Sequence, residues 1–509
     1  MLVNVEKINM SSPKFDLVIQ NGHIVDPDSG WDGPGNIGVT AGKITAVSKE
    51  PLQGHRVIEA KGQYVTPGFI DLHAHSMVQI AGNWMQAFDG VTTALELELG
   101  DLPVAQTYEL YAKQGGRPLN YGVSSSALMA RIAAIEGEMP SPEVSWYLGS
   151  FAKPEWQLDL ATDAQLDKII ELVEQGLKEG AIGIGCNYGY APAIGRKEYY
   201  RIAELAKKYD VPTYTHVRYM STEEPLSSFE AIEELIGLSF NPGAHMHICH
   251  LNSSSLRDIG DICELVVNAQ KNGANITVES YPYGALSAPI GSQFLRQDNW
   301  RGRMGNISSS DIEFLGKPLN DDSMTAMQKD QPGNLIVCHF LRPDTNQSDA
   351  EALAKSNLLP NSSIGSDSVP WQLISNDELI EDGVWPLPEG AYSHPRSSAC
   401  FTKFIKMYVR EQKKISLMEA IRKVSLIPAQ TLEKSTPQMA SKGRLKVGAN
   451  ADIVVFDLEQ LSDRATYVDP TLTSAGMSYV IVNGTPVIDQ GRLDTKARPG
   501  KPIRRPVTA

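Results

Sequence analysis

Short apolar segments alternate with amphipathic helical segments through most of the middle of the chain. The segment "DAQLDKIIELVEQGLKEG" has apolar residues at helical spacing and leads into the apolar run "AIGIGCNYGY", and similar helix–strand pairs follow up to about residue 284. Strands that alternate with helices in this way form a parallel sheet. Candidate strands end near residues 75, 99, 128, 186, 217, 250, 282 and 367. This pattern predicts an α/β fold, a (β/α)8 TIM barrel.

The two ends of the chain have a different pattern. The first 60 residues and the last 70 read as short strands separated by turns, with Asn483-Gly484 as a hairpin signal. We therefore expect residues 1–65 and 436–509 to build one small β-sandwich domain, and residues 66–435 to build the barrel. The strand-like run "NLIVCHF" exceeds the strand count, so we assign it to an insertion at about 285–345 that covers the C-terminal face of the barrel.

The strand "VTTALELELG" carries two acids among aliphatic residues. Glu96 and Glu98 are two positions apart and share one face of the strand, whereas Leu95, Leu97 and Leu99 share the other. In a barrel strand, we expect the leucines to face the outer helices and the two acids to face the barrel axis. Glu98 would lie nearer the open end of the barrel, and Glu96 one layer deeper.

Composition narrows the classes of partner and of compartment. The net charge is -14, without a run of Lys or Arg, which argues against nucleic acid or an anionic membrane surface as a partner. The first 20 residues lack an apolar segment of signal-peptide length, and no window offers about 18 consecutive apolar residues. The five cysteines are scattered, which is typical of free thiols in a reducing compartment. We therefore expect a cytoplasmic protein.

Side chains that can bind metals collect where the candidate strands end. The first strand ends in a His-x-His pair, and later strands end in a glutamate, two single histidines and an aspartate. These residues are His73, His75, Glu98, His216, His250 and Asp367. Because the active sites of such barrels lie at the C-terminal ends of the strands, the pattern predicts a metal site there.

Several motifs resemble those of a known superfamily. "TPGFIDLHAHS", "GVTT", the late "GSD" and "GRLKVGANADIVVFD" are similar to amidohydrolase motifs, and "GAIGIGCNYGYAP", "YPYGALS", "IGSDS" and "SHPRS" resemble the D-aminoacylase branch, the N-acyl-D-amino-acid deacylases. The resemblance covers nearly the whole chain. It implies a (β/α)8 barrel, a β-sandwich built from both ends and one or two zinc ions.

The chain departs from this resemblance at three places. The fourth strand lacks the lysine that many members carbamylate to bridge two metals, and the turn "ELELG" lacks the cysteine that the branch places after the second strand. We expect Glu98 to replace the bridging group, because a carboxylate can bind two zinc ions through its two oxygens. Glu96 would hydrogen-bond the ligands or serve in its place. Asn252 stands where the branch often has a charged substrate contact.

A site of this kind can hydrolyse an unactivated amide. His73 and His75 would hold one metal, and His216 and His250 the other. Asp367 would take the proton of the attacking water and later donate it to the leaving amine. By resemblance, Tyr190, Tyr283 and Ser287 would grip the substrate. Further candidate substrate contacts are Asn252, Arg296 and Arg396.

The two arginines bear on specificity. Arg396 would bind the α-carboxylate of an N-acyl-D-amino acid, and Arg296 a side-chain carboxylate, which would favour acidic substrates. The partner would thus be a small-molecule amide. A dipeptidase, a cyclic-amide hydrolase of the same superfamily and a non-catalytic relative stay open as alternatives, as does assembly into a homo-oligomer.

Overall fold

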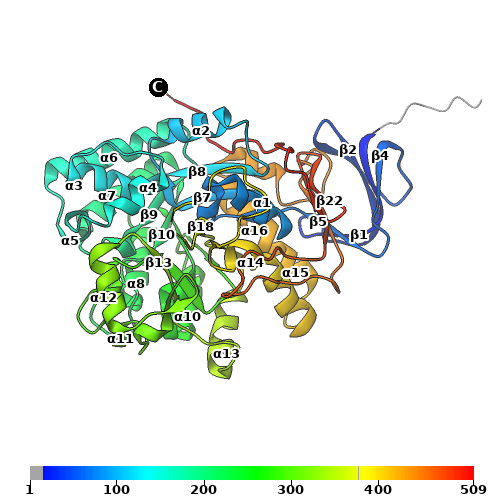
Figure 1. The fold of residues 1–509 in the computed structure, drawn as a ribbon. Helices are drawn as coiled ribbons and strands as arrows, with labels where there is room; N and C mark the ends of the chain where they lie inside the picture. The colour runs from blue at the N-terminus through cyan, green and yellow to red at the C-terminus, as the bar shows by residue number, and fades with distance from the viewer. Residues whose placement is uncertain (1–14, 376–377, 509) are drawn as a thin grey trace, which may run out of the picture.

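Two β-rich regions organise the chain in the computed structural model, which describes residues 15–375 and 378–508 (Figure 1). The predicted lack of a signal peptide rests largely on residues that lie outside this range. Within the described residues, no helix has the length and apolar character needed to cross a membrane.

The central region is a parallel eight-stranded sheet whose strands follow one another in sequence order. Its strands are β6 (Phe69–Asp71), β7 (Val91–Asp101), β8 (Asn120–Ser126), β9 (Ile184–Asn187), β10 (Pro212–His216), β11 (His245–Ile248), β12 (Ile276–Ser280) and β17 (Ser363–Ile364). The last strand approaches the first just beyond their ends, where Ala74 pairs with Ser368 in parallel. The sheet is therefore nearly closed, and the predicted barrel is confirmed.

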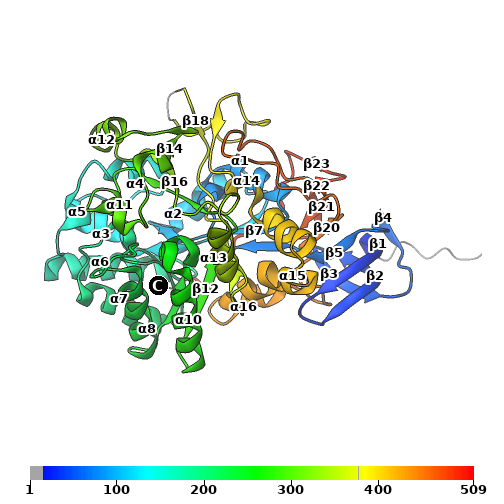
Figure 2. The ribbon, with the colours of Figure 1, turned by 90° about the horizontal axis from the view of Figure 1, so that it is seen from below.

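Helices cover the outside of this sheet (Figures 1 and 2). The longer ones are α1 (Ile80–Phe88), α2 (Val104–Lys113), α3 (Ala127–Glu136), α6 (Asp163–Lys178), α7 (Arg196–Tyr209), α8 (Ser228–Phe240), α10 (Ile259–Lys271), α13 (Gln347–Asn357) and α14 (Arg396–Ile405). Helix α12 (Asp321–Asp330) is of similar length and belongs to the insertion. Shorter helices are α4 (Val144–Ser150), α5 (Glu155–Leu158), α9 (Leu251–Ser255), α11 (Trp300–Arg303), α15 (Leu417–Ile421) and α16 (Ile427–Glu433).

The second region is a nine-stranded sheet with strands from both ends of the chain, which lie side by side in Figure 1. Its strands are β1 (Phe15–Asp26), β2 (Trp31–Thr40), β3 (Lys43–Ser48), β4 (Gly54–Glu59), β5 (Tyr64–Pro67), β20 (Ile453–Phe456), β21 (Met477–Val482), β22 (Thr485–Asp489) and β23 (Arg492–Leu493). Residues such as Ile19 and Ile453 share one buried core. The prediction that both ends build one β domain is confirmed.

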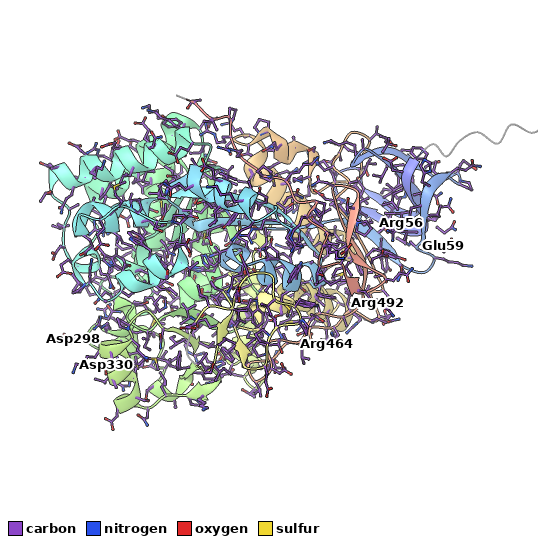
Figure 3. All side chains as sticks on the ribbon, turned by 45° about the horizontal axis from the view of Figure 1, so that its top comes forward. Arg56, Glu59, Asp298, Asp330, Arg464 and Arg492 are labelled. Atoms are coloured by element: carbon purple, nitrogen blue, oxygen red, sulfur yellow. The ribbon has the colours of Figure 1, made fainter. Side chains whose placement is uncertain are left out.

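Figure 3 labels charged residues at two opposite ends of the molecule. Arg56 and Glu59, on β4, lie at the end formed by the β domain, and Asp298 and Asp330 lie on the insertion at the opposite end. After β23 the chain runs back along the barrel, where the Ile503 amide donates to the Tyr121 carbonyl.

The insertion after β12 has a small sheet of its own. Its strands are β13 (Ala285–Pro289), β14 (Ile312–Phe314), β15 (Lys317–Pro318) and β16 (Leu335–His339), and a separate pair is formed by β18 (Gln372–Leu373) and β19 (Ala391–Tyr392). The run "NLIVCHF" forms β16, outside the barrel sheet. The insertion therefore accounts for the extra strand that the sequence pattern contained.

The side chains of β7 do not point in the directions that the sequence pattern predicts. Leu95 and Leu97 are fully buried in one cluster with Tyr214 of β10 and Cys249, which follows β11. Because β7 and β10 are not neighbours in the sheet, these side chains can meet only across the barrel interior. The prediction that the leucines face the outer helices is therefore wrong, and they fill the interior below the strand ends.

A change of register near the end of β7 brings the acids to the mouth of the barrel. Glu96 pairs with Val123 and Asp101 pairs with Ser125, so a longer segment of β7 opposes a shorter one of β8. Such a bulge redirects side chains from a regular alternation. As a result Glu98 and Leu99, predicted on opposite faces, line the same pocket.

Candidate metal and active site

A pocket at the C-terminal ends of the barrel strands contains most of the predicted site. Five of the six predicted metal-binding side chains line it, namely His75, Glu98, His216, His250 and Asp367. His73 lies directly behind them, fully buried. The insertion forms one wall with Leu286, Ser287 and Phe294, and helix α4 forms another. The structure thus brings all six residues together.

His73 and His75 form what we call the first half of the site. Their Nε2 atoms are 3.0 Å apart. The Oε2 atom of Glu98 lies 3.3 Å from His73 Nε2 and 3.6 Å from His75 Nε2. Oδ1 of Asp367 lies 3.5 Å and 3.6 Å from the same two nitrogens. Two imidazoles and two carboxylates therefore converge on one point.

His216 and His250 form the second half. His216 Nδ1 lies 3.1 Å from His250 Nε2. Oε1 of Glu98 is 3.4 Å from His216 Nδ1 and 2.6 Å from His250 Nε2. Glu98 therefore directs one carboxylate oxygen to each half.

The spacing of these donor atoms fits metal ions. Zinc held tetrahedrally by nitrogen and oxygen at about 2.0–2.1 Å places its donors about 3.3 Å apart. Most donor separations in both halves lie near that value. His250 Nε2 is closer to Glu98 Oε1, yet that buried oxygen has no aligned hydrogen-bond donor among the described residues. Atoms that approach without hydrogen-bond alignment are expected where lone pairs point at a shared cation.

The electrostatics of the two halves differ. Burial opposes ionisation of Glu98, but the nearby imidazoles, first that of His73, outweigh it and hold the pKa of this carboxyl well below its usual range. Burial lowers the pKa of His75, but Glu96 and then Glu98 raise it to about 10. Burial dominates at His216 and lowers its pKa.

The outer imidazole nitrogens have different partners in the two halves. In the first half, His73 Nδ1 lies 2.6 Å from Oε1 of Glu279, and His75 Nδ1 lies 2.8 Å from Oε2 of Glu96. Glu96 thus hydrogen-bonds a predicted metal ligand, one of the two roles that the sequence left open for it.

In the second half no carboxylate has this position. His216 Nε2 lies 3.0 Å from the sulfur of Met220, and His250 Nδ1 lies 3.0–3.1 Å from the hydroxyls of Ser253 and Ser254. The first half is therefore supported by anions and the second by neutral groups.

Asp367 lies beside the first half and is held by Arg396. The Nη2 atom of Arg396 lies 2.9 Å from Asp367 Oδ2, and Arg396 Nε donates to the Asp367 carbonyl. The guanidinium is fully buried over the ring of Tyr281 and is absent from the pocket lining. Its predicted contact with a substrate carboxylate stays a prediction, since its observed partner is Asp367.

The other predicted substrate residues divide into two groups. Tyr190 and Ser287 line the pocket, and the Tyr190 ring lies 4.9 Å from that of His216. Tyr283 instead donates its hydroxyl to the Ala399 carbonyl and lines a separate cavity. Asn252 is fully buried and donates to the carbonyls of Tyr281 and Tyr283.

Arg296 is exposed on the insertion, where its side chain donates weakly to the Gln328 carbonyl at 3.4 Å. It does not line the pocket. Among the described residues that do line it there is no lysine or arginine, and the outer walls carry apolar groups such as Met129, Tyr147, Leu148 and Phe294. The pocket therefore offers no cation to a second carboxylate.

Two residues of the site escape the sequence analysis. Glu279 lies in β12, where the same pattern that drew attention to Glu98, an acid in a short buried strand, could have found it. Tyr147 lines the pocket from α4, between β8 and β9, and burial followed by Glu98 and Glu96 raises its pKa. It follows no strand end, so no signal in the sequence indicates it.

Comparison with known proteins gives one matching family model and several similar curated proteins. The amidohydrolase family model matches residues 257–488. The N-acyl-D-glutamate deacylase of Alcaligenes xylosoxydans xylosoxydans is 25% identical over 517 residues, which cover 97% of both chains. The D-aminoacylase of the same organism is 25% identical and covers 94% of this chain and 95% of its own.

Solved structures agree in fold. The N-acyl-D-glutamate deacylase of Bordetella bronchiseptica, crystallised with zinc and a phosphonate inhibitor, has a TM-score of 0.74 at 22% identity and covers 96% of this chain and 100% of its own. A crystal structure of D-aminoacylase has the same TM-score at 19% identity, with the same coverage. The barrel and the β domain are thus shared with these enzymes.

Proposed function

We propose that the chain is a member of the amidohydrolase superfamily and a zinc-dependent deacylase of N-acyl-D-amino acids. Its reaction would be hydrolysis of the amide to a carboxylate and a free D-amino acid. The relatives that match over nearly the whole chain, N-acyl-D-glutamate deacylase and D-aminoacylase, support this choice over a cyclic-amide hydrolase.

One observation carries the proposal. The two carboxylate oxygens of Glu98 point to two different pairs of histidines, and Asp367 lies beside one pair. In a purely structural ion-pair network, one carboxylate would not need four imidazoles at the mouth of a pocket. Nitrogen and oxygen donors at this spacing suit zinc. The intact donor set also argues against a non-catalytic relative.

The residues of the site would divide the chemistry between them. When bound by these donors, a divalent metal lowers the pKa of a water and polarises the substrate carbonyl. Asp367 would accept the proton of the attacking water and donate it to the leaving nitrogen. Arg396 would hold Asp367 in place for both transfers. Tyr190, beside His216, would donate its hydroxyl to the developing oxyanion.

The pocket supports a substrate with an apolar side chain. An acidic side chain would need a cation, and its predicted partner Arg296 lies on the surface of the insertion. Burying an unpaired carboxylate against Met129, Leu148 and Phe294 would be costly. We therefore propose N-acyl derivatives of apolar D-amino acids as substrates, in place of the acidic ones that Arg296 first suggested.

The cell compartment is part of the proposal. All five cysteines are buried and unpaired. Free thiols are typical of a reducing compartment, so we propose that the enzyme works in the cytoplasm.

A panel of substrates tests the function. Zinc-loaded protein should release D-leucine or D-methionine from their N-acetyl derivatives, at a higher kcat/KM than it releases D-glutamate or either L-isomer. Hydantoins and dipeptides complete the panel. Activity confined to ring opening or to dipeptides would replace the proposal with one of the alternatives.

A further inference from the structure

Glu279 has a place in the site that the proposed reaction does not use. It lies in β12 with only 1% of its surface exposed. Its Oε1 atom is 2.6 Å from Nδ1 of His73, the nitrogen that faces away from the convergence point of the first half. We propose that Glu279 is a positioning residue, which acts through His73 to raise the metal affinity of the first half. This rests on the proposed metal-dependent function.

The hydrogen bond from Nδ1 to Glu279 fixes the tautomer and the ring orientation of His73. A carboxylate at Nδ1 keeps the proton on that nitrogen, so the lone pair of Nε2 is available to a metal. Such a partner also makes the imidazole a stronger donor, and its loss usually lowers metal affinity about 10–100-fold. His250, in the second half, has only serine hydroxyls at the corresponding nitrogen.

A buried histidine lies behind the carboxylate. The Oε2 atom of Glu279 lies 3.4 Å from Nε2 of His247 without forming an aligned hydrogen bond, and His247 Nδ1 lies 2.8 Å from the hydroxyl of Thr277. Thr277 and Glu279 are two positions apart in β12 and so share one face. The buried His247 side chain therefore fills the space behind Glu279 by packing rather than by a hydrogen bond.

The backbone beside Glu279 is shaped to admit it. A Cβ atom on Gly365, just after β17, would lie 2.6 Å from Glu279 Oε2 and 2.8 Å from its carboxyl carbon. Real Cβ contacts are not that short, so any larger residue at position 365 would displace the carboxylate. Glycine at this position therefore allows the close approach of Glu279 to β17.

A metal between His73 and Glu279 is the competing explanation for their closeness. Cys249 is also near, and the three side chains could in principle form a ligand group. The alignment of the contact between His73 Nδ1 and Glu279 Oε1 argues against this, because it meets hydrogen-bond geometry, whereas the equally short contact of His250 Nε2 with Glu98 Oε1 does not. The contact is a hydrogen bond.

The test measures metal affinity rather than turnover, so its failure is distinct from failure of the proposed deacylase. Full-length protein carrying His250→Ala retains only the first half as a site. In this background, Zn²⁺ affinity by chelator competition and the Co²⁺ absorption spectrum are compared for Glu279→Gln and for Asp89→Asn. Asp89 is a matched control, a buried carboxylate that accepts hydrogen bonds from Phe401 and Thr402 outside the site.

We expect Glu279→Gln to lower Zn²⁺ affinity about 10–100-fold and to alter the Co²⁺ spectrum, with Asp89→Asn matching the background in both. Equal affinities in the two variants would overturn the proposal. If Glu279→Gln does not fold, Gly365→Ala decides, since it displaces the same carboxylate while keeping its charge. Unchanged affinity in that variant would overturn the proposal as well.

Discussion

The two halves of the metal site share Glu98 but are supported in different ways. His73 and His75 each have a carboxylate at the outer nitrogen, Glu279 and Glu96 respectively. His216 and His250 have a thioether and two serine hydroxyls in that position. Asp367 also lies beside the first half.

The difference teaches which half binds metal more firmly and which has room for chemistry. Carboxylate partners fix the tautomer of a histidine and raise its basicity, which strengthens metal binding. The second half has three protein donors, and a zinc with three protein donors keeps a position open for water or substrate. The first half would thus anchor a metal, and the second would hold one that is more readily lost.

The largest effect on turnover is expected at Asp367, the residue proposed to transfer protons. Asp367→Asn should lower kcat about 10²–10⁴-fold, because the amide cannot accept the proton of the attacking water. Metal content should stay close to that of the unchanged protein, since the histidines and Glu98 remain. Steady-state kinetics and metal analysis on one preparation check both. A rate within about tenfold of normal would remove Asp367 from its assigned role.

Next in size is the effect of removing the shared carboxylate. Glu98→Gln should lose the second-half metal first, because that half has fewer other donors, with an affinity loss larger than the about 10–100-fold that follows loss of an outer partner of a metal-binding histidine. Glu98→Cys should be the best-tolerated change, since a thiolate can also bridge two metals. Glu96→Gln, the control, should cost less metal because it removes only the charge of a hydrogen-bond acceptor of His75. All three are compared by metal content after identical dialysis.

The opposite order of metal loss among these variants would assign the bridging role to Glu96. If Glu96→Gln lost metal while Glu98→Gln kept it, Glu96 would be the shared ligand and the two halves would not meet at Glu98.

The smallest expected difference is in pH dependence. In the metal-free protein, Glu96 and Glu98 outweigh burial and raise the pKa of His75 to about 10, whereas burial lowers the pKa of His216. A metal must displace a proton from His75 at any pH below that value, and from His73, whose pKa is raised because Glu98, Asp367 and Glu279 outweigh burial, but it finds His216 neutral. First-half affinity should therefore rise more steeply with pH than second-half affinity between about pH 7 and 9, by about tenfold per pH unit for each extra proton displaced. Equal slopes, measured in His250→Ala and His75→Ala proteins, would contradict this account of the two halves.

The sequence predicts the barrel because its signals are periodic and repeated. Each strand–helix pair gives an independent indication, and strand ends such as His216 and His250 fall where the pattern places them. The two chain ends are likewise recognisable by turns and short strands. Both predictions depend on local patterns that tertiary packing does not overrule.

The directions of the β7 side chains and the contacts of Arg296, Arg396 and Glu279 could not be predicted in the same way. A bulge after Glu96 breaks the alternation, so the period-two argument assigns Leu95 and Leu97 to the wrong side. Charge alone predicts that Arg296 and Arg396 bind substrate carboxylates. In the structure, Arg296 is exposed and Arg396 is paired with Asp367. Glu279 is recognisable as an acid in a short buried strand, but no local pattern indicates its contact with His73, about 200 residues away in sequence.

A crystal structure of the zinc-loaded full-length chain, with anomalous scattering recorded at the zinc edge, tests the central claim most directly. We predict two anomalous peaks about 3.5–4 Å apart, one contacted by His73 and His75 and the other by His216 and His250, with one oxygen of Glu98 on each. At limiting zinc, the peak at the first half should fill before the other. A single peak without contact to Glu98, or peaks that fill in the reverse order, would contradict the account.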